Sequence, residues 1–149
     1  MKFFYYAGLL LLMFSFKFTE LKSQVHVGVY HSGLINQVGV GTDNEKKYFG
    51  ELRVLATDLV DFPNGVEVLG HRNFKTGDWV NLHAGLMFGV FFEAFSAKKA
   101  GIPLGLTFKP IQEHRNFAIL MEATPILNFG AGSIALRSNI GLRYTFRRD

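Results

Sequence analysis

The chain contains no cysteine. This excludes disulfide bonds, a thiolate nucleophile, a cysteine-based metal site and a lipid anchor attached through cysteine. Charge is also sparse, at 19% of the 149 residues. Outside the first 23 residues, 13 Lys and Arg stand against 11 Asp and Glu, and this small excess gives no reason to expect nucleic acid as a partner. The length suits one domain.

Long apolar runs are absent beyond the first 23 residues, so no transmembrane helix of about 20 residues is expected there. The one apolar run, Phe3 to Phe16, follows Lys2, and this combination is typical of a secretory signal peptide. We expect residues 1–23 to be a signal peptide and residues 24–149 to be a single exported domain. An uncleaved anchor is the alternative, because Leu21 is a poor match to the small residue expected near the cleavage site.

Phenylalanine and glycine are abundant, with sixteen of each, and this composition suits β-strands joined by tight turns. Apolar and polar residues alternate along the last segment and along several earlier ones, and successive strand residues point to opposite faces. We therefore expect eight strands, over Val25–His31, Leu34–Gly41, Lys47–Thr57, Gly65–Phe74, Trp79–Phe92, Ile102–Lys109, Asn116–Leu127 and Ser133–Phe146.

The connections between these strands indicate an up-and-down barrel, in which an even strand count leaves both chain ends on one side. Three short polar turns fall on that side: Thr42–Glu45, Lys75–Asp78 and Gln112–Arg115. Less regular loops fall on the other: Asp58–Asn64, Glu93–Gly101 and Asn128–Gly132. Short periplasmic turns with longer outer loops are typical of transmembrane barrels, although these outer loops are short by that standard. The predicted fold is all-β, an eight-stranded antiparallel transmembrane barrel.

The apolar face of the barrel is expected to meet lipid rather than fill the interior. Glycines lie on the polar face, where the crowded interior of an eight-stranded barrel needs small residues. Aromatics of the apolar face cluster at the two ends, as in the aromatic girdles of membrane barrels. Those at the periplasmic end are Tyr48, Phe74, Phe108, Phe117, Tyr144 and Phe146, and those towards the other end are Phe88 and Phe92. The alternative is a soluble ligand-binding barrel with the apolar face inside.

The C-terminal segment also carries the spacing polar-x-Gly-x-x-aromatic-x-aromatic, in Asn139, Gly141, Tyr144 and Phe146. This spacing resembles the signal by which outer-membrane barrels are recognised for insertion, although three residues follow it here. With the signal peptide, the amphipathic strands and the segments Ile102–Leu106 and Glu122–Pro125, the chain resembles small outer-membrane barrels of the OmpX/OmpA type, in their Bacteroidota versions. The resemblance implies a bacterial outer-membrane location, with lipid and the barrel-assembly machinery as partners.

Charged residues and histidines share the inward face of the predicted barrel. We expect a polar network of Glu51, Arg53, Glu67, His71, His83, Lys109, Glu122, Arg137 and Arg143, with His26 nearby. An ion or proton path is one interpretation. We prefer a plug of paired charges, because an eight-stranded barrel leaves no aqueous channel. Glu122 and Arg137, on neighbouring strands, are the predicted pair. The spacing of His26, His71 and His83 is not diagnostic of a metal site, so no metal or cofactor is expected.

The predicted function is an integral outer-membrane barrel without catalytic activity, either structural or an accessory subunit of a larger envelope complex. The first alternative is a lipid-modifying enzyme similar to lipid A deacylases, because His31 and Ser138 both have the outward phase on the first and last strands. No outward acid is evident to orient the histidine. The second alternative is the secreted soluble barrel.

Overall fold

A computed structural model describes residues 24–33, 35–56, 64–92 and 98–146. The predicted signal peptide lies outside the described residues. Nine strand segments are present: β1 (Val25–His31), β2 (Asn36–Thr42), β3 (Tyr48–Ala56), β4 (Gly65–Thr76), β5 (Val80–Phe91), β6 (Lys98–Gly101), β7 (Leu104–Phe108), β8 (Phe117–Asn128) and β9 (Ser133–Phe146). In the part of the chain that the structure describes, no helix is long and apolar enough to cross a membrane.

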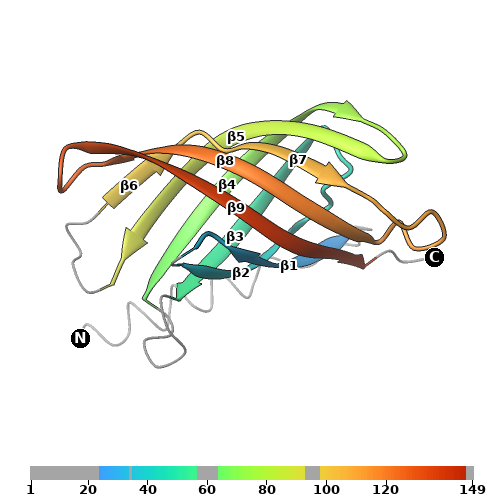
Figure 1. Ribbon diagram of the computed structural model, residues 1–149, viewed down its shortest axis with the longest axis horizontal. Helices are drawn as coiled ribbons and strands as arrows, with labels where there is room; N and C mark the ends of the chain where they lie inside the picture. The colour runs from blue at the N-terminus through green and yellow to red at the C-terminus, as the bar shows by residue number, and fades with distance from the viewer. Residues whose placement is uncertain (1–23, 34, 57–63, 93–97, 147–149) are drawn as a thin grey trace, which may run out of the picture.

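The strands form one closed antiparallel barrel (Figure 1). Each strand pairs with the strands beside it in the chain order, and β1 pairs with β9 to close the barrel. The closing ladder runs from Val25 opposite Phe146 to His31 opposite Ile140. β1 therefore pairs with only half of β9, whereas β8 pairs with β9 along its whole length. The barrel predicted from the sequence is confirmed.

The sixth strand of the barrel is interrupted and consists of two segments, β6 and β7. The nine strand segments therefore form an eight-stranded barrel. β6 and β7 both lie between β5 and β8, and their register with each neighbour is unchanged across the gap. Pro103 interrupts the ladder because proline has no N–H, yet its carbonyl still accepts a hydrogen bond from the Gly85 N–H at 2.9 Å. The prediction that Glu93–Gly101 is a loop is wrong at its end, since Lys98–Gly101 forms β6.

The hairpin between β4 and β5 also differs from the prediction of a turn at Lys75–Asp78. Lys75 and Thr76 still pair with β5, opposite Leu82 and Asn81, after a register shift between Asn73 and Lys75. The extra residue of a bulge lets a strand continue past the point where strict alternation fails.

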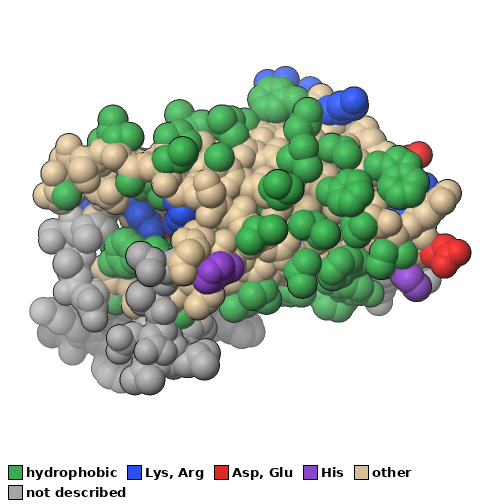
Figure 2. Space-filling model, in the orientation of Figure 1, with side chains coloured by type: hydrophobic (Ala, Val, Ile, Leu, Met, Phe, Trp, Pro, Cys, Tyr) green, Lys and Arg blue, Asp and Glu red, His purple; other side chains and the backbone are tan. Residues whose placement is uncertain are grey.

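The outside of the barrel is apolar and the inside is polar. Hydrophobic side chains cover the visible wall of the molecule (Figure 2), and exposed examples from several strands are Val29, Val68, Leu86, Leu104, Met121, Ile140 and Leu142. Leu86 is 70% exposed, whereas inward Glu67 on the neighbouring strand is fully buried. A surface of this kind is unfavourable in water and suited to hydrocarbon, so the wall is a lipid-facing surface.

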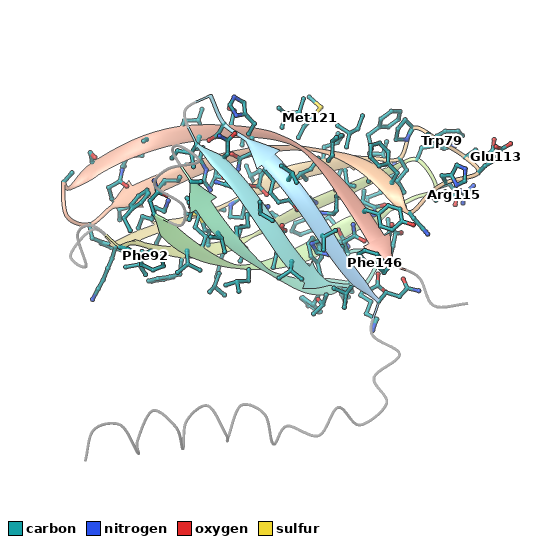
Figure 3. The ribbon with its side chains drawn as sticks, turned by 90° about the horizontal axis from the view of Figure 1, so that it is seen from below. Trp79, Phe92, Glu113, Arg115, Met121 and Phe146 are labelled. Carbon is teal, nitrogen blue, oxygen red and sulfur yellow. The ribbon has the colours of Figure 1, made fainter. Side chains whose placement is uncertain are left out.

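Outward aromatics stand at both ends of this wall, as predicted. Figure 3 shows Trp79 and Phe146 at one end, which we call the C-terminal end, and Phe92 at the other. Tyr144 contacts Phe146 edge-to-face, with ring centroids 5.0 Å apart. Girdles of aromatic residues flank the apolar band of membrane barrels, so the two sets mark the two ends of the lipid-facing wall.

Close backbone approach explains one inward glycine, Gly85 on β5. A Cβ atom added there would collide with the carbonyl of Gly70 on β4 and crowd the His71 ring. Gly70 itself faces outward, and a Cβ atom added to it would meet open space. The two glycines therefore differ in what they tolerate, although they lie on paired strands.

We expect cysteines placed at Leu82, Leu104 and Leu142 to resist a charged, water-soluble maleimide in intact membrane vesicles, because these side chains face acyl chains. The chain has no native cysteine, so each variant carries one reactive site. Ala131→Cys, in the exposed turn between β8 and β9, is the matched control and should label rapidly. Labelling of the three leucine positions at the rate of the control would show that the barrel is inside out.

We expect Gly85→Ala to lower the unfolding free energy of the barrel by about 1–3 kcal/mol, because the backbone of β4 has to move to admit the methyl group. Gly70→Ala should change it by less than about 0.5 kcal/mol. Urea unfolding in detergent micelles, followed by tryptophan fluorescence, measures both. Equal effects of the two substitutions would contradict the close approach of β4 and β5.

Candidate functional site: the polar barrel interior

The nine residues predicted to line the interior all point inward and are buried, the most exposed being Arg137 at 9%. They come from β3, β4, β5, β8 and β9, together with Lys109, which directly follows β7. Charged groups are stable in such a place only when they are paired and hydrogen-bonded. The pairs form three groups along the barrel.

The central group is organised around Arg53. Its guanidinium donates to both carboxylate oxygens of Glu122 across the barrel, at 2.8 and 3.0 Å, and its Nε donates to Glu51 at 3.2 Å. Arg143 donates to the other Glu51 oxygen at 2.8 Å and to the Tyr30 hydroxyl at 3.1 Å. Two acids and two bases thus compensate each other, and the two-pronged Arg53–Glu122 pair joins opposite walls.

The second group is centred on Glu67, which receives two cations. Arg137 donates to both of its oxygens at 2.6 and 2.9 Å, and the Lys99 ammonium lies 2.6 Å from Oε1. The predicted pairing of Glu122 with Arg137 is therefore wrong. Although the two lie on neighbouring strands, the long Arg137 side chain reaches across the interior to β4.

The third group lies towards the C-terminal end, where Lys109 meets a residue from a turn. Its ammonium lies 2.8 Å from the Glu45 carboxylate and donates to the Gly77 carbonyl at 2.9 Å. Glu45 lies between β2 and β3, in the segment predicted as a short polar turn. Its side chain, 26% exposed, reaches inward to the Lys109 ammonium.

Sequence reasoning missed two charged members of the network, Lys99 and Glu45. The alternation along Ile102–Lys109, extended backwards, would have given Lys99 the inward phase. No comparable signal marks Glu45, because turns have no face periodicity. Asn139 was predicted only as part of the assembly signal, but it also donates to Glu122 at 3.1 Å.

The four residues of the predicted assembly signal divide between the two faces of β9. Asn139 and Gly141 are buried inward, and Tyr144 and Phe146 are exposed outward at 44% and 54%. The outward pair belongs to the aromatic set at the C-terminal end. This division is the one expected for the motif, whose recognition by the assembly machinery stays a prediction.

Two histidines of the interior, His71 and His83, lie against each other near Glu122. Their ring centroids are 5.0 Å apart and nearly perpendicular, and His71 also stacks on Phe49 at 4.6 Å. His26 lies apart from this pair: its Nδ1 is 2.5 Å from the Thr42 carbonyl oxygen, and its ring packs edge-on against Phe49. His26 is nevertheless linked to His71 through Glu51, whose Oε2 lies 3.6 Å from His26 Nε2 and 3.9 Å from His71 Nε2.

The outer wall carries a groove of about 740 Å³ that includes both His31 and Ser138. Apolar side chains such as Leu104, Met121 and Ile140 form much of its lining. His31 is oriented by Asn36, whose amide oxygen lies 2.8 Å from Nδ1. The groove thus brings the two candidate residues of a lipid-modifying enzyme to one place, with a neutral amide as the histidine's partner.

We expect Glu67→Gln to destabilise the barrel by about 3–5 kcal/mol, because Arg137 and Lys99 would both lose their buried counter-charge. The exposed pair between Arg115 and Asp78, at 2.8 Å, offers a control, and Asp78→Asn should cost less than about 1 kcal/mol. Urea unfolding in micelles compares the two variants. A Glu67 variant as stable as the control would contradict a tightly coupled interior.

No protein-family model matches the sequence. No curated protein matches it significantly either. Among solved structures, the fold is similar to the N-terminal β-barrel domain of Pseudomonas aeruginosa OprF, with a TM-score of 0.59 and 15% identity, covering 83% of this chain and 96% of that one. It is also similar to the Yersinia pestis outer membrane protein Ail, with a TM-score of 0.55 and 16% identity, covering 83% and 98% of the two chains. At these identities the likeness concerns the fold, which is that of small outer-membrane β-barrels.

Proposed function

We propose that this chain is a non-catalytic integral protein of the bacterial outer membrane, acting as a structural element or as an accessory subunit of a larger envelope complex. The observation that carries the proposal is the pairing of a lipid-facing wall with an interior filled by ion pairs. Membranes are spanned only by helices or by closed barrels. The fold shared with outer-membrane barrels supports the location.

The interior supports a structural role rather than transport. Arg53 and Glu67 are fully buried and Arg143 is 1% exposed, so these charges are not in contact with bulk water. An aqueous channel would need them solvated, whereas each is engaged by a counter-charge from another strand. The network therefore ties the wall together as a plug.

The enzyme alternative is favoured by one observation, the shared groove of His31 and Ser138, and disfavoured by another. In the Ser-His-Asp arrangement a carboxylate both orients the histidine and stabilises the imidazolium that forms during catalysis. Asn36 supplies a neutral amide at 2.8 Å, which orients the ring but stabilises its charge less than a carboxylate would. An acyl chain of the surrounding lipid would also fill this apolar groove, so the groove alone does not indicate a catalytic site.

Cell fractionation tests the location and the role. The chain should sediment with outer membranes, resist extraction by carbonate, and migrate in mild detergent at a size above that of one barrel in its micelle. Recovery in the soluble periplasm or the medium would support a soluble barrel and contradict the proposal. If the protein migrates as a single barrel after extraction with mild and with harsh detergent alike, the accessory role is contradicted and the structural role is retained.

We expect deletion of the gene, or His31→Ala and Ser138→Ala, to leave the acyl pattern of lipid A unchanged in mass spectra. The reason is that the partner of His31 is the neutral Asn36 amide, while Glu122, the one acid lining the groove among the described residues, is held by Arg53. If lipid A from wild-type cells lacks an acyl chain that is present in lipid A from the His31→Ala variant, the enzyme alternative is established instead. Met121→Ala, in the same groove, controls for changes in lipid packing alone.

A further inference from the structure

We propose that the barrel interior binds one divalent transition-metal ion of the zinc class, through His71, His83 and Glu122. This inference goes beyond the proposed function, and it does not depend on whether the barrel belongs to a larger envelope complex. The ligand atoms come from β4, β5 and β8, so an ion there would join three strands across the interior.

The three side chains converge. One ligand atom from each lies within 4.8 Å of the others, and all three residues are buried. Ligand atoms around a tetrahedral zinc ion lie about 3.4 Å apart, given zinc–nitrogen and zinc–oxygen distances of about 2.0–2.1 Å. Closing the site therefore needs movements of the ligand atoms on the order of 1 Å each.

The two histidines also have unused ligand atoms, which is an independent observation. His71 and His83 are 3% and 4% exposed, and none of their four ring nitrogens has a hydrogen-bond partner among the described residues. Buried polar atoms without partners are uncommon and costly, and an unseen ion is one of their standard explanations. Other interior side chains of the described residues leave single atoms without a partner, such as His26 Nε2 and Arg143 Nη1, whereas His71 and His83 each leave both ring nitrogens without one.

The surroundings hold the imidazole rings in position. Gly105 on β7 pairs with His83 on β5 and with Glu122 on β8. Its missing side chain leaves the space that the His83 ring fills, and a Cβ atom added there would collide with that ring. The Phe49 ring stacks on His71 with an interplanar angle of 18°. The two contacts limit the positions that the imidazole rings can take.

The three ligands determine the class of ion, and the charged groups nearby limit its affinity. Two imidazoles and a carboxylate are a common zinc ligand set with an open fourth position. Glu51 lies on the same side, with its Oε2 3.9 Å from His71 Nε2, and could approach as the fourth ligand. Arg53 already donates to both oxygens of Glu122 and competes with the ion for them. We therefore expect micromolar rather than picomolar affinity.

The test uses untagged protein extracted from membranes, stripped with a chelator and titrated with zinc sulfate against a chromophoric indicator. We expect about one zinc per chain and a dissociation constant in the micromolar range. His71→Gln and His83→Gln should each weaken binding by at least about tenfold, because each removes a nitrogen ligand. The double variant His31→Gln with His114→Gln, which removes two exposed histidines, should bind as the wild type does.

Folding of each variant is checked by its heat-dependent gel mobility. If a variant does not fold, zinc X-ray absorption on the wild-type protein still decides, and two imidazole ligands are the expected signature. Less than about 0.1 zinc per chain, a spectrum without imidazole, or binding lost only with the exposed histidines would overturn the proposal. In that case ordered water, rather than a metal ion, satisfies the ring nitrogens.

Discussion

The structure depends on the ladder that joins its first strand to its last. Inside hydrocarbon every backbone N–H and C=O has to find a partner within the protein, because no water is available to replace one. An open sheet of these strands would leave two edges unsatisfied. Pairing of β1 with β9 removes the edges where the two strands meet, and it also turns one face of every strand towards an enclosed space.

Enclosure determines the chemistry of the interior. Charges that would be solvated on an open sheet are buried, so they persist only as compensated groups, and each group draws its members from distant parts of the chain. Arg53 and Glu122 are 69 residues apart in sequence, and Arg137 and Glu67 are 70 apart. The interior thus holds together strands that make no backbone contact with each other.

Much of this arrangement could be predicted from the sequence, because side-chain alternation is a local property. It located the strands, the inward face and the aromatic ends. It could not predict which charges meet, since that depends on the stagger accumulated around the barrel and on the reach of long side chains. Arg137 illustrates the point, pairing with Glu67 on the opposite wall instead of Glu122 beside it. Glu45 was missed because a turn has no periodicity to indicate its direction.

The uneven lengths of the strands have a consequence for the surrounding bilayer. β1 and β2 are seven residues long, whereas β8 and β9 have 12 and 14. A strand needs about 9–11 residues to cross the hydrocarbon core. Lipids beside β1 and β2 meet a low hydrophobic wall, and lipids beside β8 and β9 meet a tall one. Thinning of the bilayer, snorkelling of flanking side chains or association with a neighbour relieves such a mismatch, and around this barrel the need for it is directional, greatest beside β1 and β2.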